Sequence, residues 1–170
     1  HPTLTDADLK AGCELAARYQ VASVCIKPHA VPQAVQWLAG TGVAVGTVVG
    51  FPHGGNAAEV KWRETELACT QGAEEIDLVI NIGKALSGDW EYVEGEIRGV
   101  CEIAHRHGAR VKVILETDFL HAGGAGLNGD DLKRTLCRLC ETAGADWVKT
   151  STGFGFVKRP GGGYDYQGAT

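Results

Sequence analysis

The sequence predicts an α/β protein with parallel strands, and three observations carry this prediction. Short β-rich runs alternate with amphipathic helical patterns along the 170 residues. A Gly-Ala pair follows three of the helical patterns at a constant spacing of 36 residues, at Gly72, Gly108 and Gly144. Polar side chains gather where the β-rich runs end, and parallel α/β folds keep their chemistry at that edge.

The first helix is predicted to begin near Thr5, because Thr5 followed by Asp8 resembles a helix N-terminus, and to continue to about Tyr19. Asn56 followed by Glu59 likewise resembles a capping box, for a helix that ends at the first Gly-Ala pair. Glycine suits a position just after a helix because it tolerates the left-handed backbone found there. The expected helices are 5–19, 31–38, 56–72, 93–104 and 132–143.

The runs between these helices are apolar and rich in β-branched residues, which is typical of buried parallel strands. The expected strands are 21–26, 43–49, 76–80, 111–115 and 147–150. Strands that alternate with helices every ~30–36 residues imply right-handed crossovers. Two architectures fit, a doubly wound open sheet and part of a (β/α)₈ barrel, and the near-constant period favours the barrel. The segment 154–168 is glycine-rich and is expected to be a long loop.

Composition excludes several classes of protein. A formal net charge of −5 gives no basic surface for nucleic acid or for anionic lipid, so neither partner is expected. No apolar run is long enough to span a bilayer, and no signal segment opens the chain, so the expected location is cytoplasmic. The motif Cys137-x-x-Cys140 lies inside a helical pattern, where packing is a simpler interpretation than a metal site, and no metal is expected.

Three ionisable residues stand in or at the end of otherwise apolar strands: Asp77, Lys112 and Lys149. If neighbouring strands direct them to one face, they converge. A lysine amine desolvated there becomes a nucleophile, and a nearby carboxylate can transfer protons, which together suggest carbonyl chemistry through a Schiff base. The alternative is a buried Asp77–Lys112 ion pair with Lys149 merely at a strand end. Residue spacing alone leaves both open.

Five motifs in order resemble the deoxyribose-phosphate aldolase family, whose members are class I aldolases with a (β/α)₈ TIM barrel. Together the motifs extend over most of the chain. They are 22–28 (ASVCIKP), 47–54 (TVVGFPHG), 72–81 (GAEEIDLVIN), 111–117 (VKVILET) and 144–154 (GADWVKTSTGF).

The resemblance implies a lyase that reversibly cleaves 2-deoxy-D-ribose 5-phosphate to D-glyceraldehyde 3-phosphate and acetaldehyde. It implies that Lys149 forms the Schiff base and that Asp77 belongs to the proton relay. The substrate-binding residues that it implies are Lys112, Thr152, Gly153 and Cys25. Packing is an equal alternative for Cys25. No cofactor is expected, because the lysine amine supplies the electron sink. The resemblance is also compatible with a homo-oligomer.

A (β/α)₈ barrel typically needs ~250 residues. By resemblance, residues 1–170 are therefore expected to form an incomplete barrel domain with about strands two to six, without the first strand and the last two. The family's second relay lysine, in a Lys-x-x-Gly-Gly context, then lies beyond the chain, and residues 168–170 begin the next helix, with Thr170 as its N-cap. Two alternatives stay open: a related class I aldolase acting on another small phosphosugar, and an inactive fragment of such an enzyme.

Overall fold

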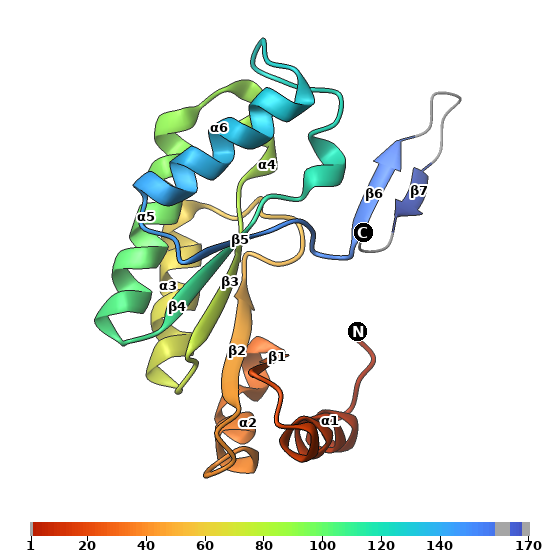
Figure 1. Ribbon diagram of the computed structural model, residues 1–170, viewed down its shortest axis with the longest axis vertical. Coiled ribbons are helices and arrows are strands. Elements are labelled where there is room, and N and C mark those ends of the chain that lie inside the picture. Colours follow the sequence, from red (N-terminus) through yellow and green to blue (C-terminus); the bar gives the residue numbers. More distant parts are fainter. Residues whose placement is uncertain (1, 159–163, 168–170) are drawn as a thin grey trace.

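The computed structural model describes residues 2–158 and 164–167, and its centre is a five-stranded parallel sheet (Figure 1). The strands lie side by side in the order in which they occur in the chain, β1-β2-β3-β4-β5. Their bounds are β1 (Ser23–Ile26), β2 (Ala44–Val49), β3 (Glu75–Val79), β4 (Arg110–Ile114) and β5 (Trp147–Lys149). In a doubly wound sheet the strand order reverses at a switch point, whereas in a barrel neighbouring strands follow one another along the chain. The expected partial barrel is confirmed.

The helices predicted between the strands are all present, and one more was missed. Their bounds are α1 (Asp6–Tyr19), α2 (Val31–Trp37), α3 (Ala58–Thr70), α4 (Ile82–Ser87), α5 (Trp90–Arg106) and α6 (Gly129–Thr142). The missed helix, α4, has only 6 residues, so it is too short to show an apolar stripe. It begins directly after Asn81, whose side chain accepts a hydrogen bond from the backbone N–H of Lys84.

The expected helix start at Thr5 and the expected capping box at Asn56 have different outcomes. The Thr5 hydroxyl accepts a hydrogen bond from the Asp8 backbone, and the Asp8 carboxylate accepts one from the Thr5 backbone, so the helix start at Thr5 is confirmed and takes the form of a capping box. The second is wrong. Helix α3 begins at Ala58, its N-cap is Ala57, one residue after the expected cap, and no side chain caps it. The Asn56–Glu59 spacing is that of a capping box, but no side-chain hydrogen bond caps this helix.

The 36-residue repeat is a repeat of helix endings. Gly72, Gly108 and Gly144 have φ angles of +101°, +76° and +88°, in the region that glycine tolerates best. After α3, the N–H groups of Gly72 and Ala73 donate to the carbonyls of Cys69 and Ala68, which is a Schellman ending. The same two bonds recur after α5 and after α6. The repeated sequence therefore marks the turn from each of these helices into the next strand.

Replacing Gly108 by alanine is expected to destabilise the fold by ~1 kcal/mol or more, because alanine disfavours a positive φ. Among the described residues, no atom apart from those of its two chain neighbours lies within 4 Å of the added Cβ, so the cost is conformational. Gly95 is the matched control: it is exposed, inside α5 and equally uncrowded, so alanine there is expected to stabilise by ~0.5–1 kcal/mol. Urea denaturation midpoints measure both. Shifts in the same direction would contradict this account.

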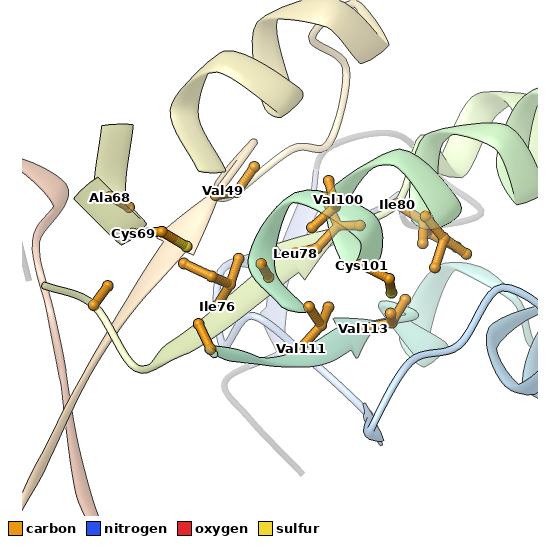
Figure 2. Packing of buried hydrophobic residues seen from close by; sticks show 14 of the residues in the cluster. Val49, Ala68, Cys69, Ile76, Leu78, Ile80, Val100, Cys101, Val111 and Val113 are labelled. Atoms are coloured by element: carbon orange, nitrogen blue, oxygen red, sulfur yellow. The ribbon is translucent and has the colours of Figure 1, made fainter. Parts of the chain in front are cut away.

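The main hydrophobic cluster lies between the sheet and its helices. Ile76 and Leu78 of β3 and Val111 and Val113 of β4 are fully buried and alternate with polar neighbours that point to the other face. Figure 2 shows these strand residues packed against Ala68 and Cys69 of α3 and Val100 and Cys101 of α5. The opposite face of β3 to β5 carries the charged side chains Asp77, Lys112 and Lys149, together with the buried Val79 and Ile114.

The glycine-rich segment after residue 154 is not the long loop that was expected. It contains an antiparallel hairpin of β6 (Gly155–Lys158) and β7 (Tyr164–Gln167). In Figure 1 the hairpin projects away from α3, α5 and α6. Glycines obscured the alternation that marks a strand pair. The helix start expected at 168–170, including the Thr170 cap, lies outside the described residues.

All six cysteines are free, so none of them forms a disulfide bond. Cys137 is exposed and Cys140 is buried, so the two members of the Cys-x-x-Cys motif point in different directions from α6. Within residues 2–158 and 164–167 no group of three or more possible metal ligands comes together. Within the same residues, no helix combines the length and the apolar character needed to cross a bilayer.

Candidate active site

The polar face of the sheet brings together the three ionisable residues that the sequence singled out. Asp77 of β3 pairs in register with Lys112 of β4, and Ile114 of β4 pairs with Lys149 of β5. Paired residues of parallel strands point to the same side, and residues two apart along a strand share a face. Lys149 therefore lies two residues closer to the carboxyl edge than Asp77 and Lys112 do.

Asp77 binds both lysines. Its Oδ1 lies 3.2 Å from Lys112 Nζ and its Oδ2 lies 2.7 Å from Lys149 Nζ. The Asp77 side chain is only 5% exposed, whereas the Lys149 side chain is 40% exposed and can meet a solute. The Asp77–Lys112 ion pair is thus present, but Lys149 belongs to the same network. The simpler alternative, in which Lys149 merely ends a strand, does not describe this geometry.

Glu75, which the sequence reasoning did not single out, binds the other side of Lys112. Its Oε2 lies 2.5 Å from Lys112 Nζ, and its Oε1 lies 3.5 Å from the Arg110 guanidinium. Glu75 is two residues before Asp77 on β3, so the alternation that placed Asp77 on the polar face could have placed Glu75 there too. The Lys112 ammonium also lies over the Trp147 ring, 5.2 Å from its centre.

These contacts keep Lys112 and Glu75 charged. Burial by itself lowers the pKa of Lys112, but the hydrogen bond to Glu75 and the charge of Asp77 outweigh it, so the pKa is raised from its ordinary value. Burial by itself raises the pKa of Glu75, but the hydrogen bonds from Lys112 and Ser23 outweigh it, so this pKa is lowered. Lys112 is consequently an ammonium at neutral pH and has no lone pair with which to attack a carbonyl.

The loop after Lys149 is held by Glu116, which is 1% exposed and was also missed. The Glu116 carboxylate accepts hydrogen bonds from the Ser151 hydroxyl at 2.8 Å, from the Thr152 backbone N–H at 3.1 Å and from the Thr152 hydroxyl. The Thr152 hydroxyl also accepts a bond from Phe154, and the Gly153 N–H donates to Ser151. Thr152 and Gly153, both expected to contact the substrate, therefore make hydrogen bonds that stabilise the conformation of this loop.

A cavity of about 650 Å³ opens beside the charged groups. Its wall includes Cys25 and Val48, and Val48 pairs in register with Asp77, so cavity and network adjoin. Lys149 and Asp77 are not among the residues that line it. Phe51 and Phe154 meet edge to face with ring centres 5.5 Å apart, and both line the cavity. The wall near the charges is therefore mostly apolar.

Cys25, an expected substrate contact, does reach this cavity, and its side chain is exposed. The low-polarity surroundings and the Asp77 charge nevertheless raise the pKa of its thiol to about 11. The thiol is therefore neutral at physiological pH and is a poor nucleophile. This favours a lining role for Cys25 over a chemical one.

A second ion pair, fully buried, fixes the segments that flank the site. Lys61 of α3 and Glu96 of α5 have no exposed side-chain surface, and Lys61 Nζ lies 2.5 Å from Glu96 Oε1. Lys61 also donates to the carbonyls of Gly54 at 2.7 Å and Val79 at 2.9 Å, and Glu96 Oε2 accepts from the Asn81 N–H at 2.8 Å. Burial lowers the pKa of Lys61 and raises that of Glu96. The pair connects the loop after β2 to the end of β3.

An amine next to a buried carboxylate, at the carboxyl edge of a parallel β/α sheet, is typical of barrel enzymes that form imines with carbonyl substrates. Comparison with known proteins shows the family. Residues 2–167 match the model of the DeoC/LacD family of aldolases. The chain belongs to this family.

Individual relatives carry a more specific name. The chain is 47% identical over 154 residues to the deoxyribose-phosphate aldolase of Rhodopirellula baltica, a match that covers 91% of this chain and 61% of the relative. It is 45% identical over 151 residues to the deoxyribose-phosphate aldolase of Aciduliprofundum boonei, covering 89% of this chain and 64% of the relative. The chain thus spans less than two thirds of the length of these curated relatives.

A solved structure agrees in fold. The tetrameric deoxyribose-phosphate aldolase of Aeropyrum pernix superposes with a TM-score of 0.79 at 31% sequence identity, covering 90% of this chain and 60% of that one. The family that the sequence motifs resembled is therefore confirmed by the comparisons.

Proposed function

We propose that the protein acts as a deoxyribose-phosphate aldolase in which Lys149 forms a Schiff base with the aldehyde carbon of 2-deoxy-D-ribose 5-phosphate. One observation carries this proposal: the half-exposed Lys149 amine lies 2.7 Å from the buried Asp77 carboxylate, beside a cavity at the carboxyl edge of the sheet. The names of the relatives support the choice of substrate.

In the cleavage direction, the neutral Lys149 amine attacks C1 of the open-chain sugar and water leaves, which gives an iminium ion. The iminium accepts electrons as the C2–C3 bond breaks, and the C3 hydroxyl loses its proton. Glyceraldehyde 3-phosphate departs and an enamine remains on Lys149. Protonation at C2 and hydrolysis then release acetaldehyde. Asp77, within hydrogen-bond distance of the amine, receives and returns protons in these steps.

The remaining residues support this reaction without entering it. Lys112 is a fixed cation next to Asp77, and Cys25 lines the adjoining cavity. Thr152 and Gly153 contribute through the shape of the loop that follows Lys149, because the Thr152 hydroxyl and the Gly153 N–H already have partners within that loop. The lysine amine supplies the electron sink, so the proposal needs no cofactor.

The compartment and the assembly are parts of the same proposal. Six free thiols suit a reducing compartment such as the cytoplasm. The Aeropyrum pernix relative is described as tetrameric, which supports a homo-oligomer for the protein that contains this chain.

The test is reductive trapping with acetaldehyde and borohydride, performed on the full-length gene product that contains this sequence. An ethyl group is expected on Lys149 and not on Lys112, as read by peptide mass mapping. Cleavage of 2-deoxyribose 5-phosphate is then compared with that of other small phosphosugars. Absence of an adduct on Lys149 rejects the mechanism. An adduct without cleavage of 2-deoxyribose 5-phosphate keeps the mechanism and rejects the substrate.

A further inference from the structure

The charged groups on the polar face form a line of alternating sign. Along this line, Arg110 contacts Glu75, Glu75 contacts Lys112, Lys112 contacts Asp77, and Asp77 contacts Lys149. The shortest of these contacts is the one between Glu75 and Lys112, at 2.5 Å, and the Asp77–Lys112 contact is longer, at 3.2 Å. Lys112 is therefore bound more closely by Glu75 than by Asp77.

The fold makes room for Glu75. Its side chain is 8% exposed, and the neighbouring position on β2 is Gly46, where an added Cβ would lie only 3.2 Å from the Glu75 Cβ. A larger residue at Gly46 would press on the carboxylate stem. Trp147 covers the other side, with its ring 4.9 Å from the Arg110 guanidinium and 5.2 Å from the Lys112 ammonium. The Glu75–Lys112 pair is thus held in place from two sides.

The two carboxylates compete for one ammonium. Without Glu75, Asp77 would be the only carboxylate bound to Lys112, and it would have to neutralise Lys112 and serve Lys149 at the same time. An ion-paired carboxylate is a weaker proton acceptor, because a nearby cation stabilises its charged form. Because Glu75 pairs with Lys112, the Asp77 carboxylate is less occupied by Lys112 and interacts more strongly with Lys149.

We propose that Glu75 is a positioning residue, which holds Lys112 as an ion-paired cation and so leaves Asp77 free to exchange protons with Lys149. This inference rests on the proposed function, because it concerns the protons of the Schiff-base reaction. The groups that face Glu75 are Ser23 and Cys25 from β1 and Arg110 and Lys112 from β4. On β2, Gly46 and Val48 bring no charge, Asp77 shares the strand of Glu75, and Lys149 of β5 lies beyond Asp77.

The first test is Glu75→Gln in the full-length gene product. Without the Glu75 charge, the Lys112 ammonium pairs with Asp77 alone and stabilises its carboxylate form, so the acid limb of the kcat/KM profile is expected to move to lower pH by ~0.5–1 unit. We expect kcat to fall ~10-fold with a smaller change in KM, since proton transfer is affected and binding is not. Glu75→Asp, which keeps the charge, should return the limb to its wild-type position. Glu74→Gln is the matched control, because Glu74 is the adjacent but exposed residue.

The second test asks whether Glu75 acts through Lys112. In a Lys112→Met background, Glu75→Gln should cause no further shift of the acid limb. An equal shift in both backgrounds, or an unshifted profile in the single variant, overturns the proposal. A shift in Glu74→Gln as large as that in Glu75→Gln also overturns it, since any local charge would then suffice.

A measurement on the unsubstituted protein covers the case in which Glu75→Gln does not fold. Reductive methylation with formaldehyde, followed by mass mapping over a pH series, should modify Lys112 only at high pH, because the hydrogen bond to Glu75 and the charge of Asp77 raise the pKa of Lys112. Ready methylation of Lys112 at neutral pH overturns the role of Glu75. Loss of acetaldehyde trapping on Lys149 in the same protein would reject the proposed function instead, so the two failures are distinguishable.

Discussion

Replacing Lys149 by methionine is expected to abolish trapping by acetaldehyde and to lower kcat/KM for cleavage of 2-deoxyribose 5-phosphate on the order of 10⁴-fold or more, because the covalent route is lost. Methionine keeps much of the length and the apolar stem of lysine, so the strand and its loop should remain in place. The Asp77 carboxylate loses one partner but keeps Lys112 at 3.2 Å. Circular dichroism checks that the fold is retained.

Lys112→Met is the matched comparison, since it removes the other amine that Asp77 binds. This variant should still be trapped on Lys149, with a slower reaction, because Lys112 is an ammonium whose pKa is raised by Glu75 and Asp77. Only the unprotonated amine is a nucleophile, so a lysine with a raised pKa is poorly suited to the attack. An adduct on Lys112 in the Lys149→Met variant would show that the two lysines have been assigned the wrong way round.

Much of the fold could be predicted because its rules are local. Each Gly-Ala pair ends a helix through the backbone of a single glycine, and the 36-residue period of Gly72, Gly108 and Gly144 makes the β/α order visible. The convergence of Asp77 with Lys112 follows from alternation along a strand together with parallel pairing. These inferences require no knowledge of side-chain contacts across the molecule.

Other features depend on contacts between distant residues and have no local pattern. Lys61 and Glu96 occur in helices with many other charged residues, and only the packing of α3 against α5 shows that both are buried. Glu116 directly follows the strand predicted at 111–115, but its backbone is left-handed, with φ +51°, and its carboxylate binds a loop 35 residues later. Glu75 is the exception, because its spacing from Asp77 was visible in the sequence.

Removing one member of the buried Lys61–Glu96 pair is expected to destabilise the fold strongly. Lys61→Met leaves the Glu96 carboxylate buried without its cation and leaves the carbonyls of Gly54 and Val79 without this donor. We expect a loss of ~3–5 kcal/mol in the free energy of unfolding, the range typical of a broken buried ion pair. Chemical denaturation of the full-length gene product measures it.

The control is Lys10→Met, which breaks the exposed Lys10–Glu14 pair on α1, with side chains 56% and 63% exposed. Water and salt screen such a pair, so its loss should change stability by less than ~0.5 kcal/mol. Lys61→Met combined with Glu96→Gln should cost less than the sum of the two single changes, because the double variant leaves no unpaired buried charge. If Lys61→Met changed the free energy of unfolding as little as Lys10→Met does, water would have to reach the Lys61–Glu96 pair. The contacts of Lys61 with Gly54 and Val79 would then not hold the ends of β2 and β3 firmly beside Asp77.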